Sequence, residues 1–260
     1  DAHRAVGGID VLTAGAAGAV GVNADIKEPK VLNKKIDYGT QNIVKGSAMT
    51  REQAIRAILT GIELVKSTDA DVIGIGEMGI GNTTTSSAVL AILTDSVVSD
   101  VTGRGGGITD ESYQKKLQVI ETAIWLNQPD KDDVIDVLAK VGGFDLCAMC
   151  GTFLGAARMR IPAVIDGFIS VVAALCAVRL CPMVREYLIP SHDPSSSRLD
   201  KSRNPLYQIA LKFIDISQSF RLHPLLTLRA FLPVSLIGLI TSYVYHFRRE
   251  DLHNFLEHSL

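Results

Sequence analysis

The sequence predicts an α/β fold in which helices cover both faces of a parallel sheet. Two short apolar runs with the length of buried strands alternate with longer segments at helical spacing, an order typical of parallel sheets. Of 260 residues, 47% are hydrophobic and 21% are charged, which excludes a disordered or coiled-coil chain. Only 6% are aromatic and 22 residues are glycine, a balance that favours small-residue helices on a sheet over a β-sandwich.

The first predicted helix begins at a capping box. The Thr50 hydroxyl can accept a hydrogen bond from the amide of Gln53, and the Gln53 side chain can bond back to the amide of Thr50. Apolar residues then recur three and four positions apart, which predicts one buried helix face. These residues are Ile55, Ile58, Leu59, Ile62 and Val65.

A strand and two helices are expected next. The apolar run DVIGI at 71–75 has the length and composition of a buried parallel strand. The small residues at 82–93 predict a closely packed helix. Another helix starts at Thr109 or Asp110, either of which can cap it, and runs to about residue 126.

The alternation of helix and strand continues beyond this point. Pro129 and Asp130 are residue types that open helices, and the glycines at 142–143 end one, so a helix is expected between them. Residues 144–159 and 168–180 are predicted as apolar helices. The run at 161–165 between them is predicted as a strand of the same parallel sheet.

Charge and cysteine content limit the class of protein. The net charge is −2, from 26 basic and 28 acidic residues, which argues against nucleic-acid binding driven by bulk charge. Four cysteines are too few for a disulfide scaffold and favour a reducing compartment. The first ten residues lack the apolar core of a signal peptide. A cytoplasmic protein is therefore expected.

The cysteine spacing raises the question of a zinc site. Cys147 and Cys150 are three positions apart, and Cys176 and Cys181 are five apart. Because Cys147, Cys150 and Cys176 fall in predicted apolar helices, we interpret these cysteines as small buried hydrophobic residues. We predict no metal and no other cofactor.

One segment raises the question of a membrane span. Residues 230–247 contain no Lys, Arg, Asp or Glu, and two arginines follow them. These 18 residues are at the lower edge of the roughly 20 that a spanning helix needs. The alternative, which we favour, is a buried helix or strand interrupted by Pro233 and Gly238.

The most informative segment is the glycine-rich loop GIGEMGIGNTTT at 74–85. It follows a predicted strand and leads into a predicted helix, whose free amides and positive dipole end suit an anion. Its GxGxxG pattern matches a dinucleotide fingerprint only formally, because two more residues prolong the loop. Asn82 stands where a P-loop needs lysine, which argues against ATP or GTP hydrolysis. The loop predicts a site for one phosphate; the alternative is a turn kept for packing.

The polar residues of this loop should have different roles. The threonine hydroxyls at 83–85 add donors for a phosphate. The Glu77 carboxylate would repel a phosphate and should instead face a sugar hydroxyl or a cationic ring.

Further charged residues are expected near the phosphate. Arg104 lies in a second glycine loop at 102–107, and Lys115 and Lys116 lie in the helix after it. Arg104 and one of these lysines would supply positive charge, unless they are simply solvated. Asp166 ends the second predicted strand, where sites of parallel α/β sheets form; alternatively it caps the next helix.

Five motifs occur in an order that resembles one enzyme family. They are GEMGIGNTT at 76–84, VTGRG at 101–105, AKVGG at 139–143, DGF at 166–168 and YLIPSH at 187–192, and the run KIDYGTQNIVKGSAMT at 35–50 adds to them. Together they resemble nicotinate-nucleotide:dimethylbenzimidazole phosphoribosyltransferase, an enzyme family of cobalamin synthesis. The resemblance covers about residues 20–192 and implies a Rossmann-like α/β domain with a small helical part from the chain ends.

The resemblance also implies a reaction and a set of site residues. Members transfer ribose 5-phosphate from nicotinate mononucleotide to dimethylbenzimidazole, giving α-ribazole 5′-phosphate and nicotinate with inversion at C1′. The partners implied are these two substrates and a second copy of the chain in a homodimer. By motif match, the substrate-binding residues are Gly76, Met78, Gly79, Ile80, Gly81, Asn82, Thr83, Arg104, Lys116, Asp166 and Ser191.

The ends of the chain depart from the family pattern. Residues 200–260 contain no Gly-Glu-Gly-Thr-Gly motif, whose glutamate is the family's general base. Glu77 is then the candidate catalytic residue, and we expect nucleotide binding with weak turnover. The expected division is an unmatched segment 1–19, the α/β domain 20–192, a linker 193–204 and an unmatched apolar tail 205–260. The alternative function is a non-catalytic nucleotide-binding or interaction protein, tethered to a membrane through 230–247.

Overall fold

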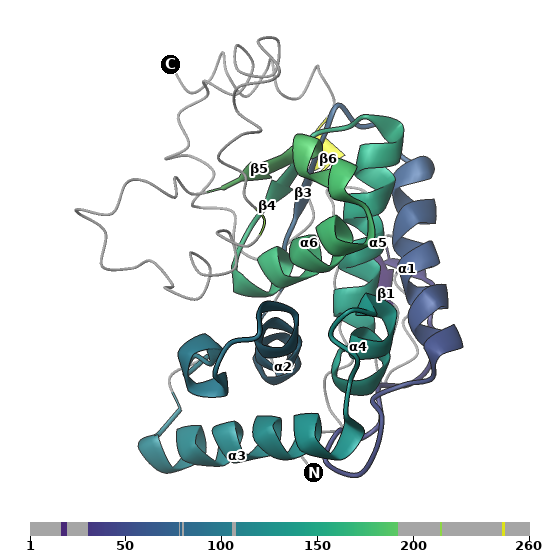
Figure 1. Ribbon diagram of the computed structural model, residues 1–260. Helices are drawn as coiled ribbons and strands as arrows, with labels where there is room; N and C mark the ends of the chain where they lie inside the picture. Colours follow the sequence, from purple (N-terminus) through teal and green to yellow (C-terminus); the bar gives the residue numbers. More distant parts are fainter. Residues whose placement is uncertain are drawn as a thin grey trace, which may run out of the picture.

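A computed structural model of the protein describes residues 17–19, 31–77, 79, 81–105, 108–191, 214 and 246–247. The described residues form helices and short strands (Figure 1). The helices are α1 (Arg51–Lys66), α2 (Thr83–Thr94), η2 (Val98–Val101), α3 (Asp110–Asn127), α4 (Val134–Val141), α5 (Phe144–Met159), α6 (Phe168–Leu180) and η3 (Pro182–Tyr187). The strands are β1 (Ala17–Ala19), β2 (Val31–Asn33), β3 (Val72–Ile75), β4 (Ala163–Ile165), β5 (Leu188–Pro190) and β6 (His246–Phe247).

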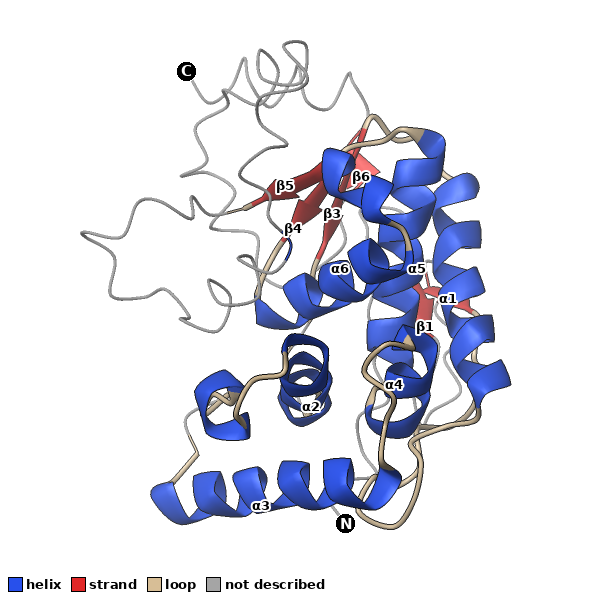
Figure 2. Ribbon diagram, in the orientation of Figure 1, coloured by secondary structure: helices blue, strands red, loops and turns tan. Residues whose placement is uncertain are grey.

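The sheet that carries the site has the order β5-β4-β3-β6. β3 pairs in parallel with β4, with Ile73 opposite Ala163, and β4 pairs in parallel with β5. β6 is antiparallel to β3. The predicted α/β fold with β3 and β4 as parallel strands of one sheet is therefore confirmed; the structure adds that they are direct neighbours, and Figure 2 shows them side by side. β5 adds a third parallel strand that the sequence analysis did not expect.

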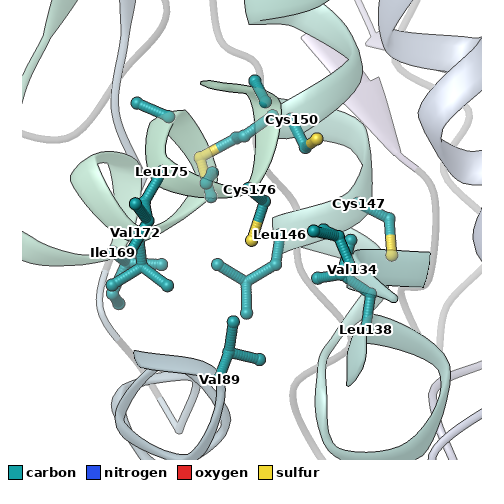
Figure 3. Packing of buried hydrophobic residues seen from close by; sticks show 14 of the residues in the cluster. Val89, Val134, Leu138, Leu146, Cys147, Cys150, Ile169, Val172, Leu175 and Cys176 are labelled. Carbon is teal, nitrogen blue, oxygen red and sulfur yellow. The ribbon is translucent and has the colours of Figure 1, made fainter. Parts of the chain in front are cut away.

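The two apolar helices α5 and α6 form the centre of the core and have the predicted bounds. Both pack on β4 and on each other. Cys147, Cys150 and Cys176 are fully buried there among leucines and valines (Figure 3), which agrees with their interpretation as small hydrophobic residues. Burial raises the pKa of the Cys176 thiol to about 12, so this thiol is not a reactive thiolate at neutral pH.

Helix α1 has the predicted capping box but buries only part of the predicted face, which includes Ile58 and Val65. Ile55 and Leu59 are 37% and 49% exposed. The buried face also contains small residues such as Ala57 and Gly61, because α1 lies directly along α5 (Figure 1). A Cβ on Gly61 would lie 2.0 Å from the carbonyl oxygen of Ala148. Close backbone contact at the small residues, together with the buried apolar side chains, therefore selects the buried face.

Of the helices that flank the site, α2 and α3 begin as predicted and α4 begins later than predicted. α2 begins at Thr83, and Thr109 caps α3, both as expected within one residue. α4 starts at Val134 rather than at Pro129–Asp130, because Asp133 is its cap. The Asp130 side chain instead accepts from the amide of Asp132 and forms a turn before the helix.

Several predicted features lie outside the described residues. These are the linker 193–204, the small helical part from the chain ends, and the apolar run up to residue 245. Within the described part of the chain, no helix has the length and apolarity needed to cross a membrane.

Candidate active site

Three polar residues lie at the carboxyl ends of the three parallel strands. Glu77 follows β3 by two residues, Asp166 follows β4 directly, and Ser191 follows β5 directly. The amide of Asp166 donates to the carbonyl oxygen of Ile75, and the Ser191 hydroxyl donates to Asp166 Oδ1 at 3.2 Å. These bonds bring the three strand ends to one edge of the sheet, where binding sites of parallel α/β proteins form. The N-cap of α6 is Gly167, so Asp166 precedes the cap by one residue.

The glycine loop turns sharply between β3 and α2. Gly79 and Gly81 have φ values of 68° and 85°, a region that residues with a Cβ avoid. The turn points the amide of Gly79 at Glu77, and this amide donates to Glu77 Oε2. The Gly79 amide is therefore used within the protein and is not one of the amides left for an anion. Met78 and Ile80 lie outside the described residues.

Glu77 is a buried carboxylate, with 9% of the residue exposed. Its Oε2 also accepts a hydrogen bond of 2.7 Å from Asn82 Nδ2. Burial raises the pKa of Glu77 to about 7, an increase that the nearby carboxylates of Asp145 and Asp166 reinforce and the hydrogen bonds from Asn82 and Gly79 oppose. A carboxyl with this pKa can both accept and release a proton near neutral pH.

Asn82 connects Glu77 to a residue that the sequence analysis missed. Asn82 Nδ2 donates a second hydrogen bond, of 2.8 Å, to Oδ2 of Asp145 in the first turn of α5. Both Asn82 and Asp145 are buried, and Asn82 Oδ1 has no hydrogen-bond donor among the described residues. An acidic residue just after two glycines, inside an otherwise apolar helix, is the sequence signal that could have identified Asp145.

Lys116 belongs to α3, and its ammonium reaches the beginning of α2. Its ammonium donates to Thr83 Oγ1 at 3.0 Å and to the carbonyl oxygen of Gly103 at 2.8 Å. Burial lowers the pKa of Lys116 to about 8. Among the described residues, the amides of Gly81, Asn82 and Thr83 have no acceptor, so they and Lys116 leave donors for an anion at this helix end.

Two other expected phosphate contacts are already used within the protein. The Arg104 guanidinium pairs with Asp110 and donates to the carbonyl oxygen of Ile108. A phosphate would have to compete with Asp110 for Arg104, whose role there stays a prediction. The Thr85 hydroxyl donates to the carbonyl oxygen of Asn82, so of the three threonines expected as donors Thr85 is not available.

The burial of Glu77 should be visible as a pH-dependent stability. The pKa of Glu77 is raised from 4.5 to about 7 on folding, so the native state loses stability as pH rises from about 4.5 to about 7. Glu77→Gln removes this ionisation and keeps an oxygen that can accept from Asn82. We expect the variant to gain on the order of 2 kcal/mol over wild type between pH 4.5 and 8, measured by urea unfolding. A stability difference that does not change with pH would contradict the raised pKa.

Comparison with known proteins relates this site to a family. A family model described as "Phosphoribosyltransferase" matches residues 4–213, which extends the 20–192 resemblance at both ends. Curated relatives named nicotinate-nucleotide–dimethylbenzimidazole phosphoribosyltransferase include those of Clostridium acetobutylicum, 53% identical, and Ruminiclostridium cellulolyticum, 52% identical, each over 176 residues. Each match covers 66% of this chain and 50% of the relative, so the chain spans about half the length of these relatives.

A solved structure agrees with this assignment. The crystal structure of CobT from Thermus thermophilus is similar with a TM-score of 0.66 and 29% sequence identity. That similarity covers 78% of this chain and 67% of the other. Since the family model matches most of the chain, the resemblance found in the sequence motifs is confirmed. The protein thus belongs to the phosphoribosyltransferase family whose curated members are named for nicotinate nucleotide and dimethylbenzimidazole.

Proposed function

We propose that this chain binds nicotinate mononucleotide and carries a phosphoribosyl-transfer site for dimethylbenzimidazole, with α-ribazole 5′-phosphate and nicotinate as products. The observation that carries the proposal is that the Lys116 ammonium reaches the open amides of α2, while Asn82, which directly precedes α2, holds the buried carboxyl of Glu77. Lys116 with these amides can hold a phosphate and Glu77 can exchange a proton, and both adjoin the loop between β3 and α2. The names of the relatives supply the substrates.

For this reaction the protein needs to position the two substrates and to provide one proton transfer. A ring nitrogen of dimethylbenzimidazole attacks C1′ from the face opposite the nicotinate, which inverts the configuration. The pyridinium is a good leaving group because it departs as a neutral ring. The benzimidazole proton must go to a base, and Glu77 is our candidate. Asn82 Oδ1, buried without a donor among the described residues, could accept a hydrogen bond from the substrate.

The assay for this function uses the chain with both substrates. Incubation with nicotinate mononucleotide and dimethylbenzimidazole should give nicotinate and α-ribazole 5′-phosphate, separated by chromatography and identified by mass. We expect binding of the nucleotide by calorimetry and slow product formation. Binding without product would favour the non-catalytic alternative, and the absence of binding would contradict the proposal.

Lys116→Met should weaken nucleotide binding about 10- to 100-fold at pH 7, because a charge-assisted bond to phosphate is lost. In the wild type, affinity should fall above about pH 8, where free Lys116 loses its proton, and this pH dependence should vanish in the variant. The matched control is Lys115→Met, a change at the exposed neighbouring lysine, which should leave affinity within about twofold. Equal losses in the two variants would show that Lys116 has no special contact.

The same resemblance supports proposals about organisation. We infer an α/β domain at 20–192, a linker at 193–204 and two further segments at 1–19 and 205–260. We also infer a homodimer, to be measured by analytical ultracentrifugation, and a cytoplasmic location.

A further inference from the structure

Asp145 is a buried acidic residue in a helix of otherwise apolar character. It is the second residue of α5, and 2% of it is exposed. Burial raises the pKa of the Asp145 carboxyl, and the hydrogen bond from Asn82 and the amides at the start of α5 oppose this rise. A Cβ on Gly143 would lie 2.3 Å from Asp145 Oδ1, so the glycine before α5 leaves the space that the carboxylate occupies.

The carboxylate of Asp145 has one side-chain partner, the amide group of Asn82, among the contacts of the described residues. The two protons of Asn82 Nδ2 go to Asp145 Oδ2 at 2.8 Å and to Glu77 Oε2 at 2.7 Å. This orientation of the Asn82 amide suits two carboxyl oxygens that both accept, because the reverse orientation would place the amide oxygen between two acceptors. With Asp145 held by the backbone of α5, the Asn82 amide cannot rotate without losing a bond.

We propose that Asp145 is a positioning residue, which fixes the Asn82 amide so that this amide holds the Glu77 carboxylate at the carboxyl edge of the sheet. The two hydrogen bonds that Asn82 donates, to Glu77 and to Asp145, are called the bridge below. The proposal rests on the proposed function only for the catalytic role of Glu77, because the bridge is present without substrate. A buried carboxylate that served only to pack α5 would be costly, because an apolar side chain of similar size fills such a space without desolvating a charge.

The bridge has a direct probe, the side-chain amide of Asn82 in protein labelled with ¹⁵N-asparagine. Asn82→Asp assigns the signal by its loss. In wild type both protons should exchange slowly, and the signal should shift with the ionisation of the carboxyls that face it. The titratable groups around the bridge are Glu77, Asp166, Asp145 and Cys147, while Lys116 contacts the neighbouring Thr83.

Two substitutions of Asp145 separate the effect of losing its hydrogen-bond acceptor from the effect of losing its negative charge. Asp145→Leu removes the acceptor, so one Asn82 proton should exchange about fivefold to tenfold faster. Asp145→Asn keeps an oxygen for Asn82 and should retain slow exchange, but the titration midpoint of Glu77 should move to lower pH because a nearby negative charge is gone. The matched control is Asp133→Asn, which removes a carboxylate that caps α4 and does not contact Asn82; exchange and midpoint should stay as in wild type.

Unchanged Asn82 exchange in Asp145→Leu would overturn the proposal, as would an equal change in Asp133→Asn. Where product forms, Asp145→Leu should lower turnover and leave nucleotide affinity within a few-fold, and Asp145→Asn should restore part of it. If Asn82 responds as expected but nicotinate mononucleotide does not bind, the positioning role stands and the proposed function fails.

Discussion

Gly151→Ala should destabilise the protein by about 2–3 kcal/mol, because α1 and α5 are in backbone contact at this position. A Cβ on Gly151 would lie 1.9 Å from the carbonyl oxygen of Ile58 and 2.7 Å from its carbonyl carbon. Both atoms belong to the backbone of α1, so relief requires the two helices to move apart along a closely packed interface. The better helix propensity of alanine, roughly 1 kcal/mol, offsets only part of this strain.

The measurement is urea unfolding followed by circular dichroism, with Gly46→Ala as the matched control. A Cβ on Gly46 would meet nothing within 4 Å, so its stability should stay within about 0.5 kcal/mol of wild type. A Gly151→Ala variant as stable as the control would mean that α1 and α5 are not held at this separation.

Glu77→Gln should reduce turnover by about 10²- to 10⁴-fold, the usual effect of removing a positioned general base. Affinity for nicotinate mononucleotide should stay within a few-fold of wild type, because Lys116 and the amides of α2 hold the phosphate separately from Glu77. The substituted side chain keeps the hydrogen-bonding oxygen and loses only the capacity to accept the proton. The expected result is therefore a change in kcat without a matching change in nucleotide binding.

Single-turnover assays with excess enzyme measure this change even when turnover is slow. Glu121→Gln, a substitution at an exposed position of α3, is the control and should behave as wild type. Two results would together refute the role of Glu77 and the expectation of weak activity. The wild type would turn over as fast as a full-length relative, and Glu77→Gln would have the same rate as wild type.

Local sequence signals located most of the helices because their ends are marked by residues with strong backbone preferences. These signals act within a few residues of the chain. They are the glycines before α5 and α6, the capping box of α1 and the cap of α3. Where local signals conflict, the prediction was wrong. Pro129 and Asp130 resemble a helix start, but the carboxylate of Asp133 is the one that reaches the free amides of α4.

Other features depend on contacts between distant residues. β5 has three residues, and only pairing with β4 distinguishes it from a loop. The exposed face of α1 contains Ile55 and Leu59, although their spacing is that of a buried stripe. The buried face is decided by how closely α5 can approach, which the periodicity of α1 alone does not contain.

By itself the sequence determined the α/β order, the glycine loop before α2, the lysine that reaches that helix and the family. These features depend on residue types and short spacings, which can be recognised in the sequence without knowledge of the fold. Only the tertiary structure decided the proton affinity of Glu77 and the part that Asp145 has in the site. Both follow from burial and from Asn82, which joins two carboxylates 68 positions apart in the chain, Glu77 and Asp145, through one amide group. Electrostatic effects of this kind depend on distance and desolvation in space, and neither is encoded in local sequence.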